Sequence, residues 1–100
     1  MFEDRKDQDG IVNVDEARSE TEALLVRIWS EVLDVSEFGI HESFLDLGGY
    51  SIAATICIQR IFEVFAVVVP LKSFFEASGT VAGLANIIDE LRKAHTDAAL

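Results

Sequence analysis

The sequence predicts an all-α domain, a small four-helix bundle of three longer helices and one short helix. Apolar residues recur at helical spacing in three segments, which begin near residues 19, 51 and 80. Half of the 100 residues are hydrophobic, enough for one packed core. The β-branched run at residues 67–69 has no second run to pair with, so we expect an extended connection there rather than a strand.

The first helix should begin at a cap provided by Ser19 or Thr21 and end near residues 33–35. Glu20 and Glu22 fall in its first turn, where the helix dipole favours acidic side chains. Its core stripe consists of Leu25, Ile28, Trp29 and Val32.

A loop then runs to Gly49 and carries five large apolar side chains, so some of them must attach it to the core. These are Phe38, Ile40, Phe44, Leu45 and Leu47.

The second helix should span residues 51–65, with Ile52 and Ile56 on the face opposite the core. Its core stripe consists of Ala54, Cys57, Ile58, Ile61 and Phe65. A short helix should follow over residues 71–77, anchored by Phe74 and Phe75. The last helix should begin at a Thr80 cap and continue to about Leu91, with a stripe of Val81, Leu84, Ala85, Ile88 and Leu91.

Charge and composition limit the partners and the location. Eighteen acidic residues against eight basic ones give a net charge of −10, which excludes nucleic acid or an anionic membrane as the main partner. The N-terminus is not a signal peptide, and no apolar run reaches membrane-span length, so we expect a cytoplasmic protein. We divide the chain into a flexible acidic leader (1–18), a folded domain (19–94) and a fraying tail (95–100).

Ser51 is the residue whose role most needs an explanation. It follows two glycines in the segment FLDLGGYSIAA, residues 44–54, and opens the second helix. Its hydroxyl could cap the helix, act as a nucleophile, or serve as a point of attachment. Gly48 and Gly49 allow a sharp turn that leaves the hydroxyl accessible, and a helix N-terminus favours a phosphate ester.

The sequence gives little support to a catalytic or metal-binding role. The segment around Ser51 lacks the last glycine of a nucleophile elbow, and the helical sequence offers no sheet to carry one. It also lacks the P-loop pattern. His41 with scattered carboxylates does not predict a metal site, and Cys57 on the core stripe predicts a buried, inert thiol. By contrast, an outward pair such as Ile52 and Ile56 is typical of a docking surface.

Three segments between about Glu20 and Ile88 form a recognisable set: "LLVRIWSEVLDV", "IHESFLDLGGYS" and "VVVPLKSFFEASGTVAGLA". Through them the chain resembles the peptidyl carrier (thiolation) domains of nonribosomal peptide synthetases, within the acyl carrier superfamily. The second segment is similar to the family signature (F)FxLGG(H/D)S, whose serine falls on Ser51.

The resemblance implies a non-catalytic, monomeric carrier without a metal. A phosphopantetheinyl transferase would attach the 4′-phosphopantetheine arm of coenzyme A to Ser51, and the arm would hold an aminoacyl or peptidyl group as a thioester during antibiotic-type biosynthesis. Further partners would be an adenylation enzyme or domain and condensation or other tailoring enzymes. Gly48, Gly49 and Tyr50 would shape the loop, while Ile52 and Ile56 would contact partners. The start at methionine and the acidic leader favour a free-standing carrier.

Three positions depart from the family pattern. Tyr50 replaces the usual His or Asp, Ile56 replaces a basic or polar residue, and Gly79 stands where a proline often precedes the threonine cap, which predicts a looser link between the last two helices. Two alternatives stay open: an acyl or aryl carrier of a polyketide or siderophore-type pathway, and an unmodified helical interaction module in which Ser51 only caps.

Overall fold

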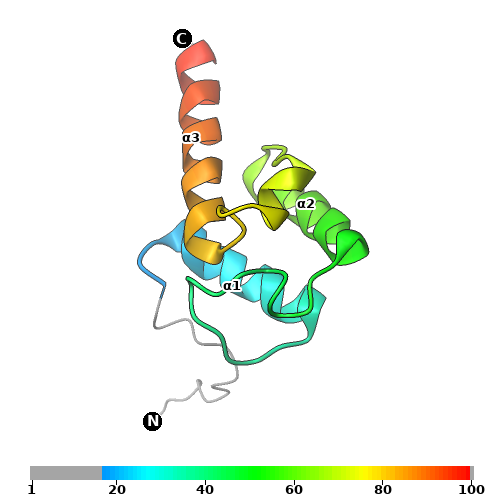
Figure 1. Cartoon of the computed structure of the whole chain (residues 1–100). Coiled ribbons are helices and arrows are strands. Elements are labelled where there is room, and N and C mark those ends of the chain that lie inside the picture. Colours follow the sequence, from blue (N-terminus) through cyan, green and yellow to red (C-terminus); the bar gives the residue numbers. More distant parts are fainter. Residues whose placement is uncertain (1–16, 100) are drawn as a thin grey trace.

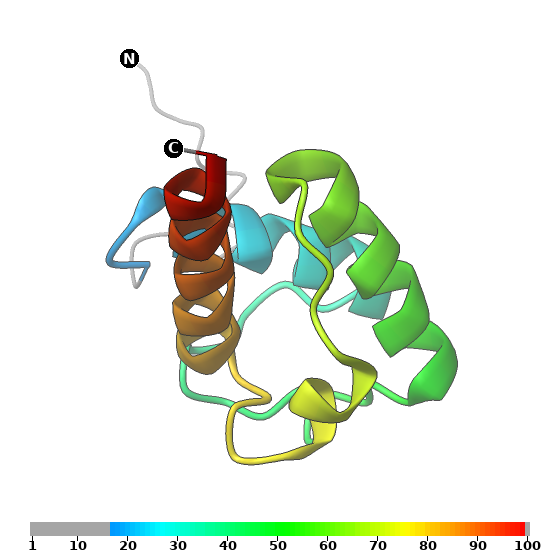
Figure 2. The ribbon, with the colours of Figure 1, turned by 90° about the horizontal axis from the view of Figure 1, so that it is seen from above.

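The computed structural model describes residues 17–99, and side chains to Ala94. Its elements are α1 (Glu20–Leu33), α2 (Ser51–Phe65), the 3-10 turn η3 (Leu71–Phe75) and α3 (Val81–Ala99). The described residues contain no strand, and residues 67–69 form the predicted extended connection. The all-α class with three longer helices and one short one is therefore confirmed. Figures 1 and 2 show the three helices around a common centre, with η3 and the long loop closing one end.

Two element lengths differ from the prediction. The predicted short helix at residues 71–77 is only a 3-10 turn, and Phe75 is 39% exposed, so Phe74 is the main anchor of that turn. The prediction that the last helix ends near Leu91 was wrong, because α3 continues to Ala99 and extends beyond the bundle (Figure 1). Residues 91–99 contain no glycine or proline to end the helix. Residues 1–16 of the predicted leader lie outside the described residues.

An aromatic cluster forms the centre of the core. Phe44, from the long loop, packs edge-on against Trp29 of α1 and Phe74 of η3, with ring centroids 5.0 and 4.9 Å apart. Phe38 also stacks against Trp29, with ring centroids 6.0 Å apart. The loop is thus attached to the core as predicted, by Phe38, Ile40 and Phe44, whereas Leu45 is 48% exposed.

Backbone hydrogen bonds join the long loop to the start of α3. The Phe44 N–H donates to the Gly79 carbonyl at 2.7 Å, and the Ala82 N–H donates to the Ile40 carbonyl at 2.9 Å. A Cβ at Gly79 would overlap the Phe74 carbonyl oxygen. The link at Gly79 is therefore closely packed, and the looser link expected without a proline stays a prediction. Thr80 caps α3 as predicted, since its hydroxyl oxygen accepts from the Gly83 N–H at 2.9 Å.

The start of α1 is held by a cap and a buried carboxylate. Ser19 is the cap, and its hydroxyl accepts from the Glu22 N–H at 3.2 Å. Thr21 instead donates to Asp89 of α3 at 2.8 Å. The buried Glu22 carboxylate accepts from the Arg18 backbone N–H at 2.6 Å and from its guanidinium at 2.8 Å. These hydrogen bonds with Arg18 lower the pKa of Glu22 from its ordinary value of 4.5.

Replacing Phe44 by alanine should strongly destabilise the fold. The ring is fully buried, and such truncations cost about 3 to 5 kcal/mol in free energy of unfolding. The matched control is Phe62→Ala, because that ring is 53% exposed and its loss should cost far less. Urea unfolding followed by circular dichroism measures both, and equal losses would contradict the central role of Phe44.

Glu22→Gln should lower stability at pH 7 and flatten its dependence on pH. Because the pKa of Glu22 is lowered in the folded protein, the carboxylate contributes stability above its unfolded pKa, and this contribution is lost as the pH falls through the folded pKa. Urea unfolding between pH 7 and pH values below about 4 measures the effect. Glu20→Gln is the control, because Glu20 lies in the same helical turn and is exposed. If Glu22→Gln has the same dependence of stability on pH as the wild type, the stabilising role of the Glu22 carboxylate is contradicted.

Candidate functional site

Ser51 is the first residue of α2, and its side chain is exposed. Of the three roles left open for its hydroxyl, capping of α2 is not what the structure shows. Tyr50 occupies the cap position, with φ −117° and ψ −172°, and its carbonyl accepts the first bond of the helix, from the Ala54 N–H at 2.9 Å. Ser51 has therefore already entered the helix. Its hydroxyl makes no hydrogen bond to any residue that the structure describes.

The two glycines determine where Ser51 lies. Gly48 has a φ of +91°, in the region that favours glycine. Gly49 is buried against the Phe44 ring, which a Cβ at this position would overlap. The Gly49 N–H also donates to the Phe44 carbonyl at 2.9 Å. The turn before Ser51 is thus built directly on the central aromatic cluster, as a loop-shaping role for these glycines requires.

The electrostatics at the start of α2 suit an anion. The first N–H groups of a helix have no intrahelical partner and carry partial positive charge. No side chain caps α2, and its first turn contains no acidic residue. An oxygen anion carried on Ser51 would therefore meet free donors and no nearby carboxylate in that turn.

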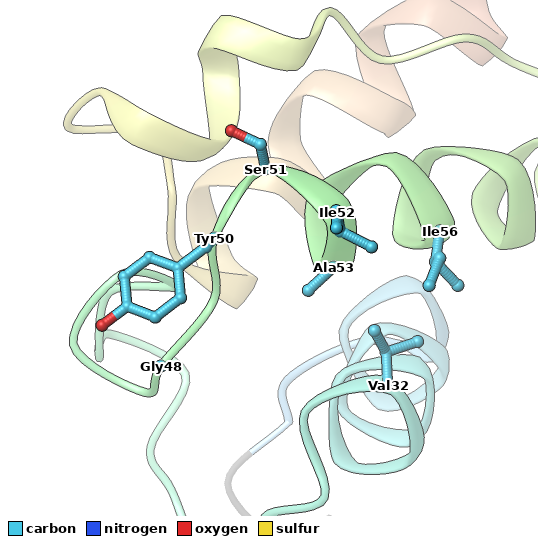
Figure 3. A pocket seen from close by; sticks show the side chains of 7 residues that line it. All are labelled: Val32, Gly48, Tyr50, Ser51, Ile52, Ala53 and Ile56. Atoms are coloured by element: carbon cyan, nitrogen blue, oxygen red, sulfur yellow. The ribbon is translucent and has the colours of Figure 1, made fainter.

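An open groove of about 580 Å³ lies beside this corner, between α1 and α2 (Figure 3). Its lining is mostly apolar and consists of Val32, Gly48, Tyr50, Ser51, Ile52, Ala53 and Ile56. Ile52 and Ile56 are 79% and 45% exposed, which confirms that they face outward. Figure 3 shows the Ser51 hydroxyl pointing away from Val32.

The remaining candidates for chemistry are structural. Cys57 is fully buried, and desolvation raises the pKa of its thiol to about 12, so it is unreactive near neutral pH. Within residues 17–99, no cluster of three His, Cys, Asp or Glu side chains could hold a metal ion. None of the helices in that part of the chain is suited to cross a membrane.

Thr55 is a neighbour of Ser51 that the sequence motifs did not single out. Its exposed hydroxyl donates to the Ser51 carbonyl at 2.9 Å. The available signal was the spacing of four residues from Ser51, which places two side chains on the same edge of a helix.

Comparison with known proteins identifies the kind of domain. Residues 23–88 match the family described as phosphopantetheine attachment site. Tyrocidine synthase 3 from Brevibacillus parabrevis is 46% identical over 76 residues, which are 76% of this chain and 1% of that protein. Gramicidin S synthase 2 from Aneurinibacillus migulanus is 41% identical over 71 residues, which are 71% of this chain and 2% of that protein. The chain thus spans only a very small part of the length of these synthases.

Solved structures support the same assignment. A peptidyl carrier protein, solved with the phosphopantetheine transferase Sfp and coenzyme A, is 32% identical with a TM-score of 0.68, over 72% of this chain and 92% of that one. A McyG A-PCP structure, complexed with phenylalanyl-adenylate, is 32% identical with a TM-score of 0.64, over 71% of this chain and 11% of that one. By its sequence, its helical fold and these matches, the chain belongs to the phosphopantetheine-attachment family, among the peptidyl carrier proteins.

Proposed function

We propose that Ser51 carries a 4′-phosphopantetheine arm, and that the arm holds an aminoacyl or peptidyl group as a thioester during nonribosomal peptide synthesis. The carrier domain would span residues 19–94, which include the family match at residues 23–88. The chain itself would perform no catalysis. The predicted cytoplasmic location and monomeric state stay predictions.

The unpaired hydroxyl of Ser51 carries this proposal. It is exposed, it is free of the capping bond that a serine at a helix start commonly makes, and it lies beside free backbone donors. In the attachment step, the hydroxyl oxygen would form a bond to the phosphorus of coenzyme A that carries the pantetheine. The bond from that phosphorus to the adenosine bisphosphate would break, and the hydroxyl proton would pass to a base on the transferase.

Attachment would also give the free backbone N–H groups at the start of α2 a hydrogen-bond acceptor. A phosphodiester on Ser51 would lie at the N-terminus of α2, where its negative charge is favoured. The pKa of the buried Cys57 thiol, raised to about 12, keeps this group from competing with the thiol of the arm for acyl groups.

The groove beside Ser51 supports a docking role for Ile52, Ile56 and Tyr50. A carrier must bind a transferase, an adenylation enzyme or domain, and condensation or other tailoring enzymes, and must release each of them. Small, partly apolar contacts suit such transient complexes. Tyr50, which is 67% exposed, and Ile56 would give this carrier a more apolar contact than basic or polar residues would provide.

Treatment with coenzyme A and a promiscuous phosphopantetheinyl transferase should add about 340 Da to the protein, as expected from the formula of the arm. Intact mass spectrometry measures the gain, and Ser51→Ala should show none. Thr55→Ser keeps a hydroxyl one turn away, at an exposed position, and serves as a control for folding and handling. No gain in the wild type with an active transferase would refute the proposal, as would a gain in Ser51→Ala.

Ile52→Ser should lower the kcat/KM of the transferase for this carrier by about threefold to tenfold, as expected for the loss of one apolar contact at an interface. Stability should change little, because Ile52 is 79% exposed. Val68→Ser is the matched control, since Val68 is also exposed, at 66%, but lies outside the groove. Equal effects of the two variants would argue against docking at Ile52.

A further inference from the structure

Thr55 lies one helical turn after Ser51, on the same edge of α2. Side chains four residues apart on a helix are neighbours, about 5 to 6 Å apart at Cβ. The Thr55 side chain is exposed, and its hydroxyl donates to the Ser51 carbonyl at 2.9 Å. The hydroxyl therefore has a defined orientation in the absence of any partner.

This orientation decides what Thr55 can bind. A threonine hydroxyl has one hydrogen to donate and two lone pairs that accept. Its hydrogen is already used on the Ser51 carbonyl, so the oxygen offers only acceptor capacity to a group on the surface. A phosphodiester has no hydrogen to donate and is not a matching partner. The pantoyl part of the arm, directly after the phosphate, carries a hydroxyl and an amide N–H, and both are donors.

The distances are compatible with such a contact. Four residues of helix correspond to about 6 Å along the axis. The pantoyl hydroxyl lies only a few bonds beyond the phosphorus, so it can reach Thr55 while the phosphate stays near the start of α2. Figure 3 shows that the Ser51 hydroxyl points away from Val32 of α1.

We propose that Thr55 is a positioning residue for the arm. Its oxygen accepts a hydrogen bond from the pantoyl hydroxyl, and the arm leaves Ser51 along the Ser51–Thr55 edge of α2. This inference rests on attachment of the arm at Ser51. It adds a direction of exit along the surface of α2, outside the part of the groove formed by Val32 and Ile56.

A single neutral hydrogen bond is sufficient for this role. Because the pantoyl hydroxyl lies only a few bonds from its covalent anchor, its contact with Thr55 is intramolecular and does not have to repay the translational entropy of binding a free molecule. The weakness of a single hydrogen bond lets the arm detach when an enzyme draws its thiol into an active site.

The experiment begins with the holo protein, prepared with coenzyme A and a transferase and verified by intact mass. Failure at this stage would refute the proposed function itself. Isotope-edited NMR on labelled protein with an unlabelled arm then detects contacts between them. We expect nuclear Overhauser effects from the pantoyl dimethyl protons to the Thr55 methyl group. We also expect holo-minus-apo shifts at Thr55 that exceed those at Val32 and Ile56.

Two variants test the hydroxyl itself. Thr55→Val keeps the shape but removes the acceptor, and it should lower the ratio of edge-bound to free arm by about fivefold, read from the averaged shifts. Thr55→Ser should restore that ratio. Ser30→Ala is the matched control, because the Ser30 hydroxyl makes the same kind of helix bond, to the Arg27 carbonyl at 2.9 Å, on α1.

Circular dichroism verifies that every variant folds. Arm contacts at Val32 and Ile56 would place the arm in the groove and overturn the inference. A holo protein without arm contacts beyond Ser51 would overturn it too, as would a Thr55→Val variant whose contacts match those of the wild type.

Discussion

The packing of Phe44 against Gly49 is the contact on which the rest of the site depends. The Phe44 ring fills the centre of the core between Trp29 and Phe74, and Gly49 lies against it with no room for a side chain. The Phe44 backbone meanwhile bonds to Gly79 at the start of α3. One loop residue thus joins the long loop to α1, to η3 and to the segment before α3, and it supports the turn that leads into α2.

The start of α2 combines exposure with rigidity. Tyr50 occupies the cap position without supplying a capping oxygen, so backbone donors and the Ser51 hydroxyl remain free in the described part of the chain. The turn that precedes them is nevertheless held by the core. A modification site needs an accessible nucleophilic atom, and a carrier needs that atom at a fixed place on its surface. The turn at Gly48 and Gly49 provides both.

The two edges of α2 next to Ser51 differ in polarity. The edge with Ser51 and Thr55 is polar, whereas the edge facing α1 carries Ile52 and Ile56 and borders an apolar groove. Ser51 also belongs to the groove lining, so an attached arm and a docking partner would occupy adjacent positions on the helix. This division follows from helical periodicity, since residues one or two positions after Ser51 point in other directions.

The sequence by itself determined the helical class, the start and end of α2, the Thr80 cap, and the outward direction of Ile52 and Ile56, because these depend on local periodicity and short-range capping. It left Ser19 and Thr21 as alternative caps of α1, and the structure decided for Ser19. The sequence also singled out Ser51 through a local motif. Only the tertiary structure decided that Tyr50 takes the cap position, that Gly79 is closely packed, that η3 is a single short turn, and that Val32 of α1 completes the groove. These features depend on contacts between residues far apart in the chain, such as Phe44 with Gly79, which no local pattern encodes.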